Sequence, residues 1–355
     1  MKISTKFKSV LCAMSGGVDS SVAAYLLKEQ GYDVKGVTMD LGLSFAIKDN
    51  NGIKDVLSDA KKVCDFLDIE HYIVNYKDYL NEKVIKKFIN EYALGLTPNP
   101  CVDCNRYLKF GALLDKAKSL GFDYLATGHY ANITNRNGSL LLQTSSDTKK
   151  DQTYFLYGIS KESLASLLFP LARMLKTEVK EIAENIKLPV VFRSESQDIC
   201  FVPDKDTKSF LEEKIDKIIP GPIKDLDGKV LGEHKGIVFY TIGQRGGLGI
   251  SHSKPLYVYS IDAVSNTIIV AEDEMMFSSS LIADNLNLFV EDIPNEGVFA
   301  KIRSAHHAAS CSALLLNNQL KITFHQKQRA VTKGQAVVLY VDDVVIGGGT
   351  IREVL

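Results

Sequence analysis

Short apolar runs and longer amphipathic runs alternate along the N-terminal part of the chain. Apolar runs predict strands at 10–14, 34–39, 71–74 and 124–127. Apolar residues at helical spacing predict helices at 22–27, 55–68, 79–94, 110–120 and 176–187. The segment 41–54 carries no strong signal and is expected to be a loop. This alternation predicts an α/β fold with a parallel sheet and helices on both of its faces.

The pattern changes at about residue 209, where short β segments replace the alternation. Strands are predicted at 236–242, 256–261, 267–270, 298–303, 312–316, 320–324, 336–340 and 344–346. Asn-Gly at 137–138 and Asp-Gly at 227–228 predict hairpin turns. Three domains follow: a catalytic α/β domain at 1–208, a small β-rich central domain at 209–277, and an antiparallel barrel or sandwich at 278–355.

Composition agrees with a chain of several ordinary domains. Its 355 residues are enough for two or three domains of about 150 residues. No apolar run approaches the ~20 residues of a membrane span, and no signal-peptide pattern is seen at the start. A cytoplasmic location without membrane association is therefore expected, in which the six cysteines are not structural disulfides. The net charge of −1 means that any RNA-binding surface must be local.

A glycine turn joins the first predicted strand to the first predicted helix. Its residues are Ser15, Gly16, Gly17, Val18, Asp19, Ser20 and Ser21. Adjacent glycines let the backbone turn sharply, and the free N–H groups at a helix start favour an anion. The turn lacks the lysine of a Walker A loop and the spacing of the dinucleotide motif. It resembles the PP-loop of ATP pyrophosphatases, which release pyrophosphate from ATP while adenylating a substrate oxygen. The alternative is an ordinary glycine-rich βα turn.

Two cysteines, Cys101 and Cys104, lie in the proline-containing segment 97–105. Prolines at 98 and 100 predict a loop that is neither helix nor central strand. The thiols fit buried packing residues or redox and nucleophilic groups equally well. A zinc site would need a second Cys/His pair at ligand spacing, and none is evident.

Two further segments carry candidate chemistry. The segment 149–157 combines two lysines with three aromatic residues, a pattern that suits phosphate attraction and base stacking in RNA binding. The alternative is a solvated turn before a buried aromatic segment. The very polar stretch 193–198 leads to Cys200, which lies between apolar neighbours.

Together these motifs resemble the tRNA-specific 2-thiouridylase family over nearly the whole chain. The resemblance rests on S-G-G-V-D-S at 15–20, T-P-N-P-x-x-x-C-N at 97–105, A-T-G-H-Y at 126–130, K-D-Q-x-Y-F-L-Y at 150–157, S-x-x-I-C-F at 196–201, T-I-G-Q-R-x-G-L-G-I at 241–250 and G-G-G at 347–349. The family places sulfur on C2 of the wobble uridine in tRNAs for Lys, Glu and Gln. The fold implied is a PP-loop domain, a β-rich central domain and a C-terminal β-barrel.

The resemblance also implies which residues form the site. The ATP-binding residues implied are Ala13, Met14, Ser15, Gly16, Gly17, Val18, Asp19, Ser20, Met39 and Gly128, with Mg²⁺ as the expected counter-ion of ATP and no tightly bound metal. The residues implied for the target base are Asn99, Pro100 and Cys101. The tRNA contacts implied are His129, Lys150, Asp151, Gln152, Arg303, Ser304 and Gln335.

The same resemblance assigns the two catalytic thiols. Cys200 is implied as the persulfide cysteine, which receives sulfur from a cysteine desulfurase or a sulfur-relay protein. Cys104, directly before Asn105, is implied as the second catalytic cysteine, which leaves a Cys104–Cys200 disulfide after transfer. Many family members carry Asp where this chain has Cys101, and we expect Cys101 to contact the target base with Asn99 and Pro100.

Two segments depart from the family pattern, at Gly246 and at 304–307. Both concern how the outer domains hold tRNA. The enzymatic alternative is another PP-loop ligase or amidotransferase, which would not need Cys104 and Cys200. A non-enzymatic alternative is an RNA-binding protein with a degenerate nucleotide site, but the intact motif and both cysteines argue against it.

Overall fold

A computed structural model describes residues 7–43, 47–49, 52–192 and 199–355. The polar stretch before Cys200, which includes Ser196 of the family motif, lies outside these residues, as do the first six residues of the chain. The chain forms two compact units. The first contains Met1–Lys83, Cys101–Asp204 and Asp343–Val345, and the second contains Val84–Pro100, Lys205–Asp342 and Ile346–Leu355.

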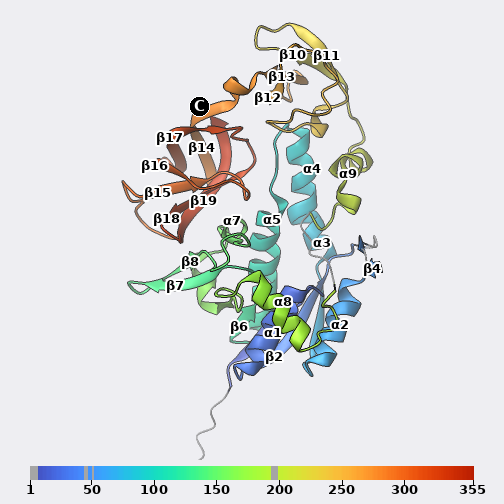
Figure 1. The fold of residues 1–355 in the computed structure, drawn as a ribbon, viewed down its shortest axis with the longest axis vertical. Coiled ribbons are helices and arrows are strands. Elements are labelled where there is room, and N and C mark those ends of the chain that lie inside the picture. Colours follow the sequence, from blue (N-terminus) through green and yellow to red (C-terminus); the bar gives the residue numbers. More distant parts are fainter. Residues whose placement is uncertain (1–6, 44–46, 50–51, 193–198) are drawn as a thin grey trace, which may run out of the picture. The chain divides into compact units, whose positions relative to one another are not determined.

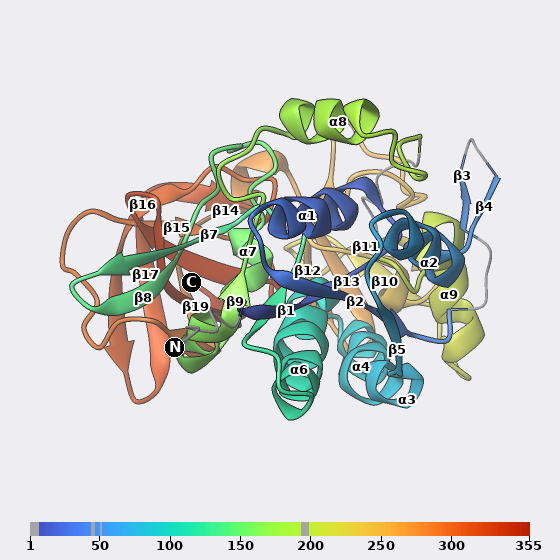
Figure 2. The same cartoon turned by 90° about the horizontal axis from the view of Figure 1, so that it is seen from below.

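The first unit is built on a five-stranded parallel sheet of order β5-β2-β1-β6-β9. The strands are β1 (Ser9–Ala13), β2 (Asp33–Asp40), β5 (His71–Asn75), β6 (Tyr124–Ala126) and β9 (Leu167–Leu168). Helices α1 (Val18–Glu29), α2 (Val56–Phe66) and α8 (Lys176–Asn185) cover one face, and α6 (Leu114–Ser119) covers the other (Figure 2). The expected parallel sheet between two helical layers is confirmed.

The core of this unit lies between the sheet and helices α1, α2 and α8. Val10 and Cys12 of β1 are fully buried against Val22 and Ala23 of α1 and Val179 of α8. Removing such side chains from water, at roughly 25 cal/mol per Å² of apolar surface, holds the helices against the sheet. The core therefore holds both the strand before the β1–α1 turn and the helix after it.

Smaller elements complete the first unit. They are the hairpin β3 (Ile47–Asp49) and β4 (Gly52–Lys54), α3 (Lys77–Leu80), the hairpin β7 (Asn132–Arg136) and β8 (Ser139–Gln143), α7 (Thr153–Leu156) and the 3-10 helix η3 (Lys161–Ser166). The hairpin turn predicted at 137–138 is confirmed. The segment 41–54, expected to be a loop, contains the small β3–β4 hairpin instead.

The loop predicted at 97–105 is wrong for its second half. A continuous helical segment runs through α5 (Pro100–Asp103), the π-helix η2 (Cys104–Leu113) and α6. Proline is tolerated at the first position of a helix, because its missing N–H would have no partner there. The proline at 100 therefore starts a helix, and Cys101 and Cys104 lie in its first turns.

The second unit contains two β structures, drawn from yellow to red in Figure 1. A four-stranded sheet has the order β11 (Val230–His234), β10 (Gly221–Lys224), β13 (Thr267–Ala271) and β12 (Tyr257–Asp262). The strand predicted at 236–242 is wrong, because this segment holds only the short 3-10 helix η5 (Ile237–Phe239). The helices of the unit are α4 (Lys86–Ala93), which continues the π-helix η1 (Asn81–Ile85), and α9 (Thr207–Lys214).

The C-terminal part of this unit is a closed antiparallel barrel. Its strands follow the order β14 (Phe277–Leu288), β17 (Gln319–Arg329), β16 (Ala309–Leu316), β15 (Val298–Lys301), β18 (Ala336–Val341) and β19 (Val344–Val354), and β14 also pairs with β19. Buried residues of these strands form one apolar cluster. The predicted barrel is confirmed. Within the described residues, no helix is both long and apolar enough to cross a membrane.

Candidate active site

The glycine turn lies at the carboxyl edge of the parallel sheet, where the strand order reverses. β1 pairs with β2 on one side and with β6 on the other, while the chain reaches β6 only after β5. Ligands of open α/β sheets bind at such a switch point. Met39 lies next to the last residue of β2, and Gly128 follows β6, so both are at the same edge as the turn after β1.

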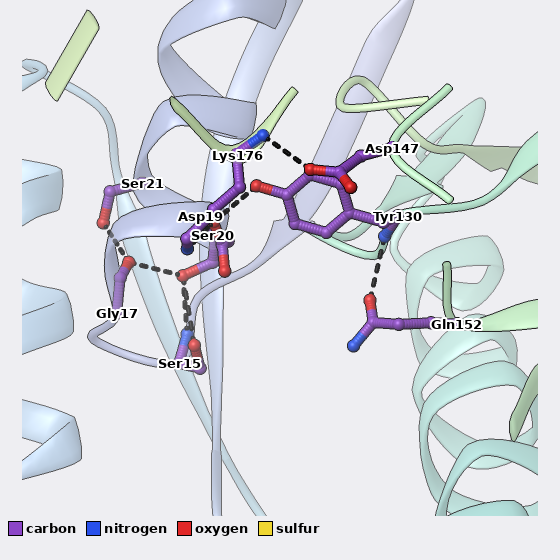
Figure 3. Close-up of polar contacts among 9 residues, drawn as sticks. All are labelled: Ser15, Gly17, Asp19, Ser20, Ser21, Tyr130, Asp147, Gln152 and Lys176. Carbon is purple, nitrogen blue, oxygen red and sulfur yellow. Dashed lines mark hydrogen bonds and ion pairs between the residues drawn. The ribbon is translucent and has the colours of Figure 1, made fainter. Parts of the chain in front are cut away.

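The serine hydroxyls of the turn form hydrogen bonds with its own backbone (Figure 3). The Ser15 N–H donates to Oγ of Ser20 at 3.2 Å, and the Ser20 and Ser21 hydroxyls donate to the Gly17 carbonyl at 3.1 and 2.8 Å. Gly16 has a φ of +68°, and an added Cβ would lie 3.1 Å from the Val56 carbonyl oxygen. The turn thus depends on a glycine with left-handed backbone at this position.

Helix α1 begins without a side-chain cap. Its N-cap is Gly17, so the first N–H groups receive no side-chain acceptor from that position. Gly128 packs directly on this helix start, since an added Cβ would lie 2.6 Å from the Ser20 nitrogen. A helix N-terminus with open N–H groups and a positive dipole end suits a phosphate. The expected ATP-binding residues are therefore placed where the fold offers an anion site.

Asp19 of the turn joins two residues from distant parts of the sequence (Figure 3). Its Oδ1 accepts a 2.6 Å hydrogen bond from Lys176 Nζ and a 3.0 Å hydrogen bond from the Tyr130 hydroxyl. Lys176 is buried at the start of α8, and its backbone N–H donates to Asp147 at 2.9 Å. No sequence motif predicted a role for Tyr130, Asp147 or Lys176 at this site. One signal in the sequence could have indicated Lys176: it is the first residue of a predicted helix, where a positive charge is unfavourable because of the helix dipole.

Three thiols of the first unit interact with one another. Cys101 and Cys200 are exposed residues and Cys104 is half-buried. Loss of hydration raises the pKa of the Cys200 thiol to about 12, and the Cys104 and Cys101 thiols add to this rise. Loss of hydration also raises the pKa of Cys101 and of Cys104. The fold therefore brings Cys200 near two cysteines that precede it by about a hundred residues in the sequence, and the pKa of each thiol lies above its usual value.

Two residues that are expected to contact tRNA, Asp151 and Gln152, make hydrogen bonds within the first unit. The Asp151 carboxylate accepts from the Ser145 N–H at 3.1 Å and from the Thr153 hydroxyl at 2.6 Å. Gln152 Oε1 accepts from the Tyr130 N–H at 2.8 Å. This hydrogen bond to Gln152 holds Tyr130 in place, and Tyr130 in turn donates to Asp19. Contact of Lys150, Asp151 and Gln152 with tRNA stays a prediction.

In the second unit, Gln335 hydrogen-bonds to the segment directly before α5 and η2, the helical segment that carries Cys101 and Cys104 and is called the cysteine helix below. Its Nε2 donates to the Thr97 and Pro98 carbonyls at 3.2 and 3.3 Å, while the Thr97 N–H donates to the Lys333 carbonyl at 3.0 Å. Asn99 is half-buried and Pro100 buried at the end of this segment. Gln335 therefore positions the backbone beside two residues expected to contact the target base.

Arg303 also bonds within the second unit. Its guanidinium donates to the Thr332 hydroxyl at 2.6 Å and to the Ala330 carbonyl at 2.9 Å. Ser304, next to it, is exposed. The predicted contact of both residues with tRNA is not tested by these bonds.

Metal ligands do not gather in the described part of the chain. Among the residues that the structure describes, no three or more His, Cys, Asp or Glu side chains form a group that could hold a metal ion.

Comparison with known proteins places the chain in a family. Models of a tRNA methyl transferase HUP domain, a tRNA methyl transferase PRC-barrel domain and an aminomethyltransferase beta-barrel domain match residues 8–204, 208–272 and 278–351. The tRNA-specific 2-thiouridylase MnmA 1 of Syntrophus aciditrophicus is 50% identical over 98% of this chain and 94% of that protein. The chain belongs to the tRNA-specific 2-thiouridylase family. The MnmA protein of Clostridium beijerinckii is 45% identical over 98% of this chain and 99% of its own length.

Solved structures resemble the family fold only distantly. A chain titled as a 4-thiouridine synthetase–RNA complex with bound ATP has a TM-score of 0.37 and 16% identity, over 59% of this chain and 50% of that chain. Family membership therefore rests on the sequence matches.

Proposed function

We propose that this chain is a tRNA-specific 2-thiouridylase that acts on the wobble uridine of tRNAs for Lys, Glu and Gln. One observation carries the proposal beyond family membership: Cys104 and Cys200 lie in the same unit as the glycine turn between β1 and α1, and the Cys104 thiol adds to the raised pKa of Cys200. A PP-loop ligase that joins nitrogen to an activated carboxyl has no use for such a pair of thiols. A cytoplasmic location is part of the proposal.

The first half of the reaction uses the turn between β1 and α1. The C2 oxygen of the uridine attacks the α-phosphorus of ATP, and pyrophosphate leaves. The open N–H groups of α1 are suited to stabilise the negative charge that develops on pyrophosphate, and the hydroxyls of Ser15 and Ser20 hold the turn in place beside them. Mg²⁺ is expected with ATP.

The second half uses the thiols. The terminal sulfur of a Cys200 persulfide attacks C2, and AMP leaves with the former C2 oxygen. The Cys104 thiolate then attacks Sγ of Cys200, the bond from Sγ to the transferred sulfur breaks, and its electron pair stays on that sulfur as 2-thiouridine forms. The product disulfide between Cys104 and Cys200 is reduced by an external dithiol before the next turnover. A cysteine desulfurase or a sulfur-relay protein supplies the persulfide.

Transfer of labelled sulfur tests the proposal. The protein is incubated with ATP, a cysteine-desulfurase sulfur source and unmodified tRNA-Glu, and the digested tRNA is analysed for 2-thiouridine. We expect label at the wobble position, lost in Cys200→Ser and Cys104→Ser and kept in Cys311→Ser, whose thiol is buried in the barrel. Pyrophosphate release without tRNA, and no label with the unaltered protein, would favour a ligase instead.

Cys101 is assigned to the target base rather than to sulfur transfer. We expect Cys101→Ser to retain part of the sulfur transfer, because a hydroxyl still fits beside the base. A loss as complete as that of Cys104→Ser would overturn the assignment of the two cysteines.

A further inference from the structure

Lys109 and Cys104 lie in the same helical segment. The two residues are five positions apart within η2, whose backbone has the i to i+5 hydrogen bonding of a π-helix. In an α-helix of 3.6 residues per turn, a residue five positions on is rotated by about 140° and points away. The wider π turn brings position i+5 back toward position i, so the Lys109 side chain starts one turn beyond Cys104.

The Lys109 ammonium contacts a neutral histidine. Nζ of Lys109 lies 3.4 Å from Nε2 of His129, and Nδ1 of His129 lies 2.7 Å from the Thr127 hydroxyl. Since an ammonium only donates, Nε2 must accept, and we assign the proton of the ring to Nδ1. Burial and the charge of Lys109 hold the pKa of His129 well below its usual value. The imidazole therefore does not compensate the positive charge.

No carboxylate neutralises Lys109 in the part of the chain that the structure describes. Its side chain is half-buried, with Phe110 next to it and Phe169 beside the His129 ring. A partly desolvated ammonium without an acidic partner is costly and attracts an anion.

The charge of Lys109 acts on all three thiols. Lys109 opposes the rise in the pKa of Cys101, Cys104 and Cys200, and no other cation of the described residues acts on all three. The charges that act against it are the Asp103 carboxylate, which raises the pKa of Cys104, and the thiols themselves.

We propose that Lys109 is the positioning residue that stabilises the sulfur anions of this site. Its ammonium is fixed through His129 and Thr127, and its side chain starts one helical turn after Cys104. The thiolate of Cys104 and the persulfide anion of Cys200 are the forms that react, and both need a nearby cation when hydration is lost. Its role in sulfur transfer rests on the proposed function, whereas its effect on the thiols does not.

Alkylation of the cysteines tests the proposal without tRNA or ATP. Iodoacetamide reacts with the unaltered protein, Lys109→Met, Lys109→Arg and the control Lys116→Met, which removes an exposed charge from α6. The rate at each cysteine is measured by peptide mass spectrometry between about pH 6 and pH 11, a range over which the rate of alkylation rises with the thiolate fraction. We expect Lys109→Met to move the profiles of Cys104 and Cys200 to higher pH, so that the rate at a given pH falls about tenfold if a profile moves by one pH unit. Lys109→Arg and Lys116→Met keep the original profiles.

A purely structural role for Lys109 gives a different result. It would lower the unfolding temperature of Lys109→Met and leave the thiol profiles of the folded protein unchanged, which overturns the proposal. Lys109→Gln, which keeps a donor for His129, replaces the methionine variant if that variant does not fold. A shifted profile in a protein that makes no 2-thiouridine would refute the proposed function and leave the role of Lys109 intact.

Discussion

Lys176 and Asp19 form a partly buried ion pair across 157 positions of sequence, with 2.6 Å between Nζ and Oδ1. The lysine side chain is 9% exposed and the aspartate side chain 33% exposed. The pair therefore joins the partly exposed Asp19 of the glycine turn to a lysine that is buried. Because Tyr130 donates to the same oxygen, the carboxylate is held in one orientation from two sides.

Replacing Lys176 by methionine is expected to weaken ATP binding and to lower stability. It leaves the partly buried Asp19 carboxylate without its cation, at a cost of about 1–3 kcal/mol for a pair that is only partly desolvated. The carboxylate then repels the phosphates of ATP. Calorimetric titration with ATP and thermal unfolding measure the two effects.

Lys180→Met is the matched control, since Lys180 is exposed on the same helix. We expect it to bind ATP as the unaltered protein does. Equal ATP affinity in Lys176→Met and Lys180→Met would show that the ion pair has no part in nucleotide binding.

Gly128→Ala is expected to abolish ATP binding, while the loss of stability is moderate and the protein stays folded. The added Cβ would lie 2.6 Å from the Ser20 nitrogen and 2.7 Å from the Asp19 carbonyl carbon, both of them backbone atoms at the start of α1. The helix start must move, at about 1–3 kcal/mol for overpacking. Gly246→Ala serves as the control, because nothing lies within 4 Å of its added Cβ. Unchanged ATP affinity in Gly128→Ala would place the nucleotide elsewhere.

The sequence predicted the placement of the turn because its cause is local. Strand, glycine pair and helix follow one another directly, and the carboxyl edge of a parallel sheet then brings Gly128 to the same place. The partners of Asp19 could not be found in this way. Lys176 and Tyr130 reach it only after the whole α/β unit has folded, and nothing in their own neighbourhoods marks them.

The helix start at Pro100 was not predicted, although its signal is local. Proline breaks a helix interior and also begins a helix, and the sequence alone did not distinguish the two positions. The apolar pattern predicted a helix only from residue 110, so it did not predict the π-helix at Cys104–Leu113. The relation between Cys104 and Lys109 was therefore not predictable from their spacing.

Acid is expected to destabilise the protein through His129. Its pKa lies well below the usual value in the folded state and returns to about 6.5 on unfolding, so the unfolded state binds the extra proton. The stabilisation is present above pH 6.5 and is lost as the pH falls toward the folded pKa, by about 1.4 kcal/mol per pH unit for one proton. The pKa values of His71 and His306 are also lowered by burial and add to the slope.

Urea unfolding between pH 7.5 and pH 5 measures this loss as a fall in the unfolding free energy. His129→Gln removes the proton uptake at this site and is expected to flatten the dependence by up to one proton. A slope that is identical in His129→Gln and the unaltered protein would mean that His129 is protonated equally in both states.

Gln335→Ala is expected to loosen the segment before the cysteine helix while the barrel stays folded. The substitution removes two hydrogen bonds to the Thr97 and Pro98 carbonyls, and leaves the bond from the Thr97 N–H to Lys333. Each lost hydrogen bond contributes roughly 1 kcal/mol to local stability. Hydrogen exchange followed by mass spectrometry should therefore be faster in peptides that cover Thr97 and Asn99.

The control for this experiment is Gln326→Ala, an exposed position on β17 of the same barrel. It should leave exchange at Thr97 unchanged, and both variants should leave exchange in β18 unchanged, because its buried residues keep their packing. If Gln335 only contacts tRNA, its removal lowers tRNA affinity without any change in exchange. If Gln335 positions the segment, exchange at Thr97 becomes faster in the free protein, in the absence of tRNA.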